Sequence, residues 1–499
     1  MLQDLPFPAE YDLNARPPEW RNPLPREPYH LLIIGGGPAG LVAARAAAAL
    51  GVRVALIEGN HLGGVSLNSG SLPSQALIRT SRLYADMRNA ALYGARAPDE
   101  VKVDFVQAME RMRRVRTRAA RNYTPERIKA MGVDLFFGMA RFMSADTVEV
   151  DGLRLRFKKA MIATGTRSLL PTIPGLDEAG YLTNESVFKL TELPRSLLVI
   201  GGGPVGCELA QAFSRFGTRT IIAHAEPLFL PKEERDAALL LAEAMSRDGV
   251  EVHLNSRAVK VEVVNGKKCV ETVNDGNVAT IGVDEILTGI GRLPAVSGLN
   301  LEAAGVDYDP EQGIKVDDFL RTSNRRIFAA GDVCLEHQFT DTAVASARIV
   351  VQNALCFGRQ RFSALTIPWC TYTDPEIAHV GIYVRQARER GIPVKTFTVP
   401  MHDVDRAIAD GEESGFVKIH VREGTDKILG ATVVARHAGE MINDLSLAMV
   451  AGIGLGTIAQ VIHAYPTQAE GIKKGAMAYM QGSAMPWRQR LLRWWYARS

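Results

Sequence analysis

The sequence predicts an α/β protein built from two similar βαβ units, followed by an α+β domain. The first unit is HLLIIGGGPAGLVAARAAAALGVRVALIEGN, in which an apolar run breaks into glycines before an alanine-rich helix and a second apolar run. The same order recurs as SLLVIGGGPVGCELAQAFSRFGTRTIIAHAE. After about residue 365, segments such as FVKIHVRE and ILGATVVARHAG are typical of antiparallel strands, with no third glycine fingerprint.

The bulk composition is that of an ordinary globular protein. A chain of 499 residues corresponds to roughly three domains of about 150 residues. Hydrophobic residues make up 46% and charged residues 23%, and the net charge of +3 gives no reason to expect a nucleic-acid partner. No apolar run reaches the roughly 20 residues that span a bilayer, and the N-terminus lacks the order of a secretory signal. We therefore expect a cytoplasmic protein.

The cysteines give no sign of a metal site. They are scattered, without a CxxC pair, so neither a zinc site nor a sequence-local disulfide is expected. We expect them to act as small buried apolar residues. The five are Cys207, Cys269, Cys334, Cys356 and Cys370.

The first glycine loop predicts a dinucleotide site. Gly35 permits a tight turn, Gly37 lets a pyrophosphate approach the backbone, and Gly40 lets helix and strand pack closely. Pro38 and Ala39 open the helix, whose N-terminal amides favour phosphate. Glu58 ends the second strand, where a carboxylate can hold both ribose hydroxyls.

The second loop predicts another nucleotide site with a different acid position. Its glycines are Gly201, Gly203 and Gly206, and Pro204 and Val205 open its helix. Aligning the two units places His224 opposite Glu58. A histidine removes the repulsion that a carboxylate exerts on a 2′-phosphate, which favours NADPH over NADH. The alternative is that His224 is only a tolerated neighbour of the adenosine.

An ordered series of motifs follows the first loop. The motifs are GGVSLNSGSLPSQAL at 63–77, ATGTR at 163–167, GIGRLP at 289–294, TSNRRIFAAGD at 322–332, WCTYTDPEIAHVG at 369–381 and HAYPTQAE at 463–470. This series resembles the pyridine nucleotide–disulfide oxidoreductases, and within that family the mercuric reductase-like proteins and dihydrolipoamide dehydrogenase.

The resemblance implies Rossmann-like FAD- and NAD(P)-binding domains and a C-terminal α+β dimerisation domain that makes a homodimer. It places Asp332 at the FAD ribityl chain and Glu208 near flavin and nicotinamide. The expected divisions are a Pro-rich arm (1–29), an FAD domain (30–168 and 293–365), an NAD(P) domain (169–292), a dimerisation domain (366–483) and a basic Trp-rich tail (484–499). Further cofactor contacts are expected from Gly64, Ala163, Thr164, Gly165, Gly291, Arg292 and Gly331.

The chain departs from the family at its redox centre. Relatives carry a CxxxxC pair over the flavin, whereas this sequence has Ser66 and Ser71 in those places. A serine hydroxyl cannot form a disulfide, so electrons cannot leave the flavin through a dithiol here. Gln75 replaces a lysine that pairs with the glutamate matching Glu208, and the loss of a nearby cation disfavours an anionic reduced flavin.

The last motif also departs from the family. Tyr465 stands where many relatives have a histidine base paired to a glutamate, which corresponds here to Glu470. With an ordinary pKa near 10, a tyrosine is a poor base at neutral pH. Mercuric reduction is not expected, because soft metal ions need the thiolates that these positions lack.

We therefore expect an enzyme that passes hydride from NAD(P)H to FAD and then electrons directly to a small acceptor such as a quinone. Ser66, Ser71, Tyr465 and Glu470, the last two from the partner subunit, are expected to line the acceptor pocket. One alternative is a flavin redox sensor without turnover, and another is an oxidase or dehydrogenase of an organic substrate. A third alternative is that the protein still reduces disulfides and uses a distant cysteine, Cys207 or Cys334, to do so.

The C-terminal tail suggests a membrane contact. It reads PWRQRLLRWWYARS, in which arginines interleave with tryptophans and leucines. A basic Trp-rich helix at residues 486–498 could lie on an anionic membrane surface. The alternative is a tail that packs on its own domain.

Overall fold

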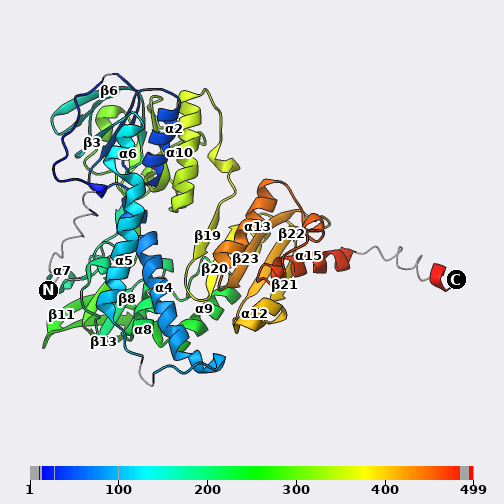
Figure 1. Ribbon diagram of the computed structural model, residues 1–499. Coiled ribbons are helices and arrows are strands. Elements are labelled where there is room, and N and C mark those ends of the chain that lie inside the picture. The colour runs from blue at the N-terminus through cyan, green and yellow to red at the C-terminus, as the bar shows by residue number, and fades with distance from the viewer. Residues whose placement is uncertain (1–10, 12–13, 27, 99–100, 484–493, 498–499) are drawn as a thin grey trace. The chain divides into compact units, whose positions relative to one another are not determined.

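The structure is a computed structural model that describes residues 11, 14–26, 28–98, 101–483 and 494–497 (Figure 1). The chain divides into two compact units. The first contains residues 1–227 and 249–365, and the second contains residues 228–248 and 366–499. The expected NAD(P) domain at 169–292 is therefore interrupted, because its segment 228–248 packs with the second unit.

A seven-stranded sheet in the first unit carries the first glycine loop. Its order is β3-β2-β1-β6-β5-β4, with β18 paired to β6. The pairs among β3, β2, β1, β6 and β18 are parallel, and β4 and β5 pair antiparallel. The strands are β1 (Tyr29–Ile34), β2 (Val54–Glu58), β3 (Val133–Phe137), β4 (Arg141–Ser144), β5 (Thr147–Val150), β6 (Leu153–Ile162) and β18 (Ile327–Ala329).

Helices α2 (Pro38–Ala49) and α10 (Thr340–Leu355) lie side by side against this sheet (Figure 1). Their close packing depends on small residues such as Ala43, Ala47 and Ala347, which are fully buried in one apolar cluster. A second cluster fills the other face of the sheet, around Phe136, Phe142 and Phe157. Because each βαβ crossover returns the chain to a parallel strand, the glycine loop lies at the carboxyl ends of the strands.

The second glycine loop belongs to a smaller parallel sheet in the same unit, ordered β10-β9-β8-β14. These strands are β8 (Ser196–Ile200), β9 (Arg219–Ala223), β10 (Val250–His253) and β14 (Glu285–Thr288). Helix α8 (Pro204–Phe216) follows β8. An antiparallel sheet joins β11 (Arg257–Val264), β12 (Lys267–Asn274) and β13 (Asn277–Val283).

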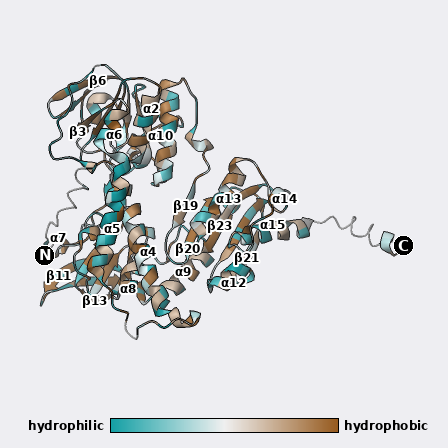
Figure 2. Cartoon of the chain, in the orientation of Figure 1, coloured by the Kyte–Doolittle hydropathy of each residue, from teal (hydrophilic) through white to brown (hydrophobic). Residues whose placement is uncertain are grey.

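The first three α-helices after β2 lie in the chain between β2 and β3 of the first sheet. They are α3 (Gly64–Asn68), α4 (Ser71–Arg88) and α5 (Phe105–Ala120), and α4 packs against both α5 and α8 (Figure 1). Figure 2 shows α5 as mainly hydrophilic, in keeping with its arginines. The shorter elements are α6 (Pro125–Ala130), β7 (Thr166–Ser168), α7 (Leu176–Ala179), β15 (Arg292–Pro294), β16 (Tyr308–Asp309) and β17 (Gly313–Ile314).

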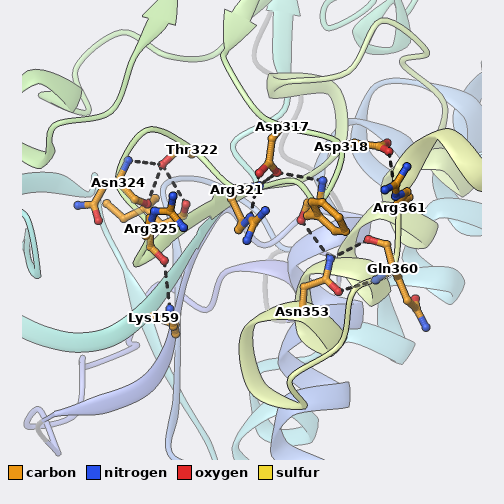
Figure 3. A network of polar contacts seen from close by, with 12 residues as sticks. Lys159, Asp317, Asp318, Arg321, Thr322, Asn324, Arg325, Asn353, Gln360 and Arg361 are labelled. Atoms are coloured by element: carbon orange, nitrogen blue, oxygen red, sulfur yellow. Dashed lines mark hydrogen bonds and ion pairs between the residues drawn. The ribbon is translucent and has the colours of Figure 1, made fainter.

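A polar network braces the loop that leads into β18 (Figure 3). Asp317 accepts a hydrogen bond from Arg321 Nε at 2.9 Å, and Lys159 Nζ on β6 donates to the Arg325 carbonyl at 3.0 Å. Asn353 near the end of α10 exchanges hydrogen bonds with the backbone of Gln360. The network holds the loop before the Asp332 motif against the sheet.

The second unit is an antiparallel sheet flanked by helices, which confirms the α+β prediction. The strand order is β19-β20-β23-β22-β21. The strands are β19 (Pro368–Thr371), β20 (Glu376–Gly381), β21 (Val394–Pro400), β22 (Phe416–Arg422) and β23 (Ile428–Ala435). The helices are α9 (Arg235–Arg247), α11 (Val384–Glu389), α12 (Asp405–Asp410), α13 (Ala438–Val450), α14 (Leu455–Ile458) and α15 (Glu470–Ser483).

His379 lies at the centre of a buried aromatic cluster in this unit. It has no exposed surface, and its ring stacks on Tyr383 with centroids 3.6 Å apart. Its Nδ1 pairs with Thr432 Oγ1 at 2.8 Å, and its Nε2 lies 3.1 Å from the Gly381 carbonyl, to which it donates. Burial lowers the pKa of His379 to about 3, so the folded protein holds this ring neutral.

We expect acid to destabilise the protein through His379. The unfolded ring titrates near 6.5, so its contribution is complete above that pH and is lost as the pH falls towards about 3. Each pH unit in this window costs up to about 1.4 kcal/mol in the free energy of unfolding. The melting temperatures of the parental protein and of His379→Gln should converge between pH 6.5 and pH 4. A constant difference across that range would contradict the assignment.

Within the described residues, no helix is both long and apolar enough to cross a membrane. Residues 484–493 and 498–499 of the tail lie outside the described residues. The side chains of Trp494, Trp495 and Tyr496 are exposed. The membrane contact at 486–498 stays a prediction.

Candidate functional site

The two glycine loops have the same geometry. Gly35 has φ +109° and Gly201 has φ +108°, a region that favours glycine. A Cβ on Gly35 would lie 2.2 Å from the Ala163 carbonyl oxygen, and one on Gly201 would lie 2.5 Å from the Gly289 carbonyl oxygen. Each loop therefore turns tightly against the end of a neighbouring parallel strand.

The third glycine of each loop has the same packing role. A Cβ on Gly40 would lie 1.8 Å from the Gly35 carbonyl oxygen, and one on Gly206 would lie 2.2 Å from that of Gly201. The helices that follow begin with Pro38-Ala39 and Pro204-Val205, and neither has a side-chain N-cap. Their first amides are therefore available to a pyrophosphate.

The acid after the first loop is held in position by backbone donors. Glu58 Oε2 accepts a hydrogen bond from the Gly36 amide at 2.5 Å, and its Oε1 accepts one from the Asn60 amide at 2.7 Å. Burial raises the pKa of Glu58, whereas these amides and the nearby Arg16 lower it. The carboxylate is thus fixed beside the loop, where the adenosine ribose of FAD would lie.

His224 occupies the corresponding place in the second loop. Its Nδ1 accepts a hydrogen bond from the Gly202 amide at 3.2 Å, as Glu58 does from Gly36. The proton must then be on Nε2, a buried atom without a hydrogen-bond partner. An unpartnered buried donor at this place fits a nucleotide whose adenosine supplies the acceptor.

Asp332 lies in a partly buried polar cluster with Thr166 and Arg292. Its Oδ2 lies 3.4 Å from Thr166 Oγ1, which also accepts a hydrogen bond from Arg292 Nε at 2.7 Å. Burial raises the pKa of Asp332, and Arg292 opposes that shift. A half-buried carboxylate of this kind fits the hydroxyl-rich ribityl chain of FAD. The neighbouring predicted residues Thr164, Gly165, Gly291 and Gly331 lie in the loops around it.

The serine motif lies directly against the first loop. A Cβ on Gly64 would lie 2.8 Å from the Cα of Gly37, and the Gly63 amide donates to the Gly36 carbonyl at 2.9 Å. Ser66 on α3 hydrogen-bonds through Oγ to Thr340 Oγ1 at 2.6 Å, at the start of α10. Its hydroxyl is therefore held between the pyrophosphate loop and α10.

The rest of the motif reaches towards the second loop. Ser71 is exposed at the start of α4, and Gln75 lies one turn further on. Helix α4 packs against α8, which carries the buried Glu208. The Ser69 carbonyl accepts a hydrogen bond from Asn184 Nδ2 at 2.9 Å. The structure thus brings the helices of Gln75 and Glu208 together.

Tyr465 and Glu470 lie in the second unit, at a pocket of about 230 Å³ lined by residues 463–465, 470, 473, 474 and 477. Tyr465 is exposed and donates from its hydroxyl to Asp405 Oδ2 at 2.8 Å, not to Glu470. Lys474 Nζ forms ion pairs with both carboxylates, at 3.7 Å from Asp405 Oδ1 and 3.4 Å from Glu470 Oε1. The hydrogen bond to Asp405 raises the pKa of Tyr465, which keeps its proton on the ring.

All five cysteines lie within the described residues, and none is in a disulfide. Cys207 is buried with Sγ 3.5 Å from the Gly202 carbonyl oxygen, and Cys334 Sγ lies 3.5 Å from that of Gly331. Burial raises the pKa of both thiols. The described residues contain no group of three or more histidine, cysteine or carboxylate side chains that could hold a metal ion.

Comparison with known proteins identifies the family. Residues 29–347 match the pyridine nucleotide-disulphide oxidoreductases, and residues 367–476 match the dimerisation domain of the same family. The chain belongs to this family. Its members are oxidoreductases that use FAD and NAD(P)H, and the dimerisation domain supports a homodimer.

Curated relatives in the family include mercuric reductases and dihydrolipoyl dehydrogenases. The chain is 34% identical to the mercuric reductase of Staphylococcus aureus, over 90% of this chain and 82% of that one. It is also 34% identical to the dihydrolipoyl dehydrogenase of Geobacillus stearothermophilus, over 88% and 93%. Among solved structures, the HOCl-induced flavoprotein disulfide reductase RclA from Escherichia coli, as its Cu(II) complex, has a TM-score of 0.82 at 29% identity, covering 91% of this chain and 99% of that one.

Three contacts of the site are absent from the sequence-based prediction. Thr340 holds Ser66, Asn184 holds the Ser69 carbonyl, and Arg16 lies beside Glu58. Thr340 and Asn184 lie far from the serine motif in the chain, and no local pattern marks them. For Arg16 the sequence holds one weak indication that its segment packs on the protein. Tyr11 and Trp20 are large aromatic residues in a stretch otherwise rich in proline and charge.

Proposed function

We propose that this family member transfers hydride from NAD(P)H to FAD and then passes electrons directly to a small acceptor such as a quinone, without a redox disulfide. The observation that carries the proposal is the serine motif. Ser66 is held by Thr340 beside the first glycine loop, and none of the five cysteines, all of which lie within the described residues, is in a disulfide. A hydroxyl stores no electrons, so the flavin would be the only electron store of the site.

The protein's residues would supply binding and orientation. When bound, FAD accepts the hydride and releases the electrons to the acceptor. The two glycine loops would bind the pyrophosphates, and Glu58 and Asp332 would hold the hydroxyls of FAD. Glu208 and Gln75, on the packed helices α8 and α4, would orient the nicotinamide. Correct orientation at reacting distance is the largest contribution such a site makes.

We further propose that the pocket with Tyr465 completes the acceptor site of the partner subunit. The chain's dimerisation domain supports the homodimer that this requires. The hydrogen bond that Tyr465 donates to Asp405 raises the pKa of its hydroxyl, so the ring would bind a flat acceptor and not act as a base. Ser66 and Ser71 would line the opposite wall with small hydroxyls.

NADPH is the nucleotide we propose for the second loop. His224 offers a neutral Nε2–H donor where Glu58 of the first loop offers a carboxylate. A donor accommodates a 2′-phosphate, whereas a carboxylate would repel it. Comparing the rates of flavin bleaching by NADPH and NADH tests this choice.

Tyr465→Phe should affect the second half of the reaction only. We expect the rate of flavin reduction by NADPH to change less than twofold, whereas reoxidation by a quinone should slow by about tenfold, since one hydrogen bond is worth about 1 kcal/mol and orientation adds to it. Stopped-flow absorbance measures both half-reactions. A slower reductive half-reaction would instead place Tyr465 on the nicotinamide side.

Replacement of cysteines tests whether a distant thiol substitutes for the missing pair. The variant Cys207→Ala/Cys334→Ala should keep its steady-state turnover with quinones within about twofold, because neither buried thiol lies in the serine motif. Cys269→Ala serves as a matched control. Loss of turnover in the double variant alone, with FAD still bound, would return disulfide chemistry to consideration.

A further inference from the structure

The Pro-rich N-terminal segment is packed on the FAD domain. Tyr11 and Ala15 are buried, and the Ala15 carbonyl accepts a hydrogen bond from the Leu62 amide at 3.1 Å. Asn22 binds both backbone groups of Phe137, at 2.8 Å to its carbonyl oxygen and 2.8 Å to its amide. Phe137 ends β3, the edge strand of the sheet, so the side chain of Asn22 takes the place of a further strand there.

The segment brings one cation to the adenosine end of the FAD site. Arg16 Nη1 donates to the Gly59 carbonyl at 2.9 Å, and its guanidinium lies 5.7 Å from the centre of the Phe137 ring. Gly59 directly follows Glu58, the carboxylate proposed above to hold the adenosine ribose. The charge of Arg16 also lowers the pKa of Glu58. It therefore favours the ionised carboxylate that a ribose diol requires.

The same segment forms one wall of a pocket at the ends of β2 and β3. The pocket has a volume of about 450 Å³ and is lined by residues 16–18, 20, 22, 61, 137 and 151. Trp20 and Phe137 give it aromatic walls in a T-shaped arrangement. In a parallel α/β sheet the nucleotide lies outside the carboxyl ends of the strands. A nucleotide whose ribose lay at the end of β2 could place its base at the neighbouring end of β3, where this pocket lies.

We propose that residues 14–26 are an added part of the FAD site that retains the cofactor by its adenosine end, with Arg16 as a positioning residue acting through Glu58. The pocket between the segment and β3 receives the adenine. The nucleotide would have to leave past this wall, so the segment slows FAD release. This role is independent of the acceptor proposed above, because it concerns how FAD is held and not where its electrons go.

The test compares the adenosine and flavin halves of FAD as separate ligands. Apoprotein of the parental chain, Arg16→Gln and Arg16→Ala is titrated calorimetrically with ADP and with FMN, and FAD release from each holoprotein is followed by fluorescence. We expect both variants to bind ADP about tenfold more weakly and to release FAD about tenfold faster, with FMN affinity changed less than twofold. Arg21→Ala, an exposed arginine of the same segment, is the matched control and should match the parental protein in each measurement.

The pH dependence separates a positioning role from a merely structural one. Without Arg16 the pKa of Glu58 rises further, so its carboxylate is protonated at a higher pH. As the pH is lowered, FAD release from Arg16→Gln should therefore begin to accelerate at a higher pH than release from the parental protein. Arg16→Lys keeps the positive charge and should restore the parental pH profile.

Equal ADP affinity in parental and Arg16→Gln protein would overturn the proposal, as would equal losses for ADP and FMN. The same loss in Arg21→Ala would also overturn it. If the Arg16→Ala apoprotein has a lower melting temperature than the parental apoprotein, only the ADP and FMN affinities of Arg16→Gln test the proposal, because that variant keeps a donor for the Gly59 carbonyl.

Discussion

Gly203→Ala is expected to produce a protein that keeps its FAD but is barely reduced by NADPH or NADH. A Cβ at this position has no protein atom within 4 Å, and its φ of −76° suits alanine. The methyl group would instead meet the pyrophosphate that the loop must approach. Losing two charged hydrogen bonds of about 1.5 to 3 kcal/mol each lowers the second-order rate of flavin reduction by about 100-fold or more.

The first loop offers a matched variant with the reciprocal phenotype. Gly37 has φ −77°, and its Cβ would come no closer than 3.7 Å to Gly64 Cα. Gly37→Ala should therefore fold but be purified largely without FAD. Stopped-flow reduction and the flavin-to-protein absorbance ratio measure the two outcomes. If Gly203→Ala loses FAD instead, or is reduced as fast as the parent, the assignment of the two loops is wrong.

Restoring cysteines at the two serines should change how many electrons the protein takes up. In Ser66→Cys/Ser71→Cys a disulfide would add a two-electron store to the flavin, so complete reduction should need two equivalents of NADPH per FAD instead of one. The chain reverses between these positions, since a Cβ on Gly70 would lie 2.9 Å from the Val65 carbonyl oxygen. That turn returns the start of α4 to α3, as a short-range disulfide requires.

Each single cysteine variant is the control for the pair. Ser66→Cys and Ser71→Cys alone should still take one equivalent, because one thiol cannot make an intramolecular disulfide with a serine. An air-oxidised double variant in which a thiol assay shows both cysteines free would contradict the placement of the two serines beside one another.

The fold could be predicted from local signals. Each βαβ unit combines an apolar strand, a glycine turn and a helix, and these patterns are contiguous in the chain. The pairing of β6 with β1 and with β18 could not be predicted from any of these strands alone, because it joins segments more than 120 residues apart in the chain. Aligning the two units pairs His224 with Glu58 because both stand at the end of the second strand of their unit. Glu58 is the last residue of β2, and His224 directly follows β9.

The rest of the site depends on tertiary contacts that no local pattern encodes. Thr340 meets Ser66 only because α10 packs beside α2. Proline content predicts extended backbone in the N-terminal arm but says nothing about the surface it packs on. Alignment with the family places Tyr465 and Glu470 where relatives have a paired histidine and glutamate, but it does not reveal Asp405, to which the Tyr465 hydroxyl donates, 60 residues earlier in the chain.

The central claim is that the flavin is the only electron store of the site. Anaerobic titration of the purified yellow protein with NADPH, followed by flavin absorbance, tests it most directly. We predict complete bleaching at one equivalent of NADPH per FAD, without a long-wavelength band from a thiolate facing the flavin. A requirement for two equivalents, or the appearance of such a band, would contradict the claim and show that a thiol pair takes part.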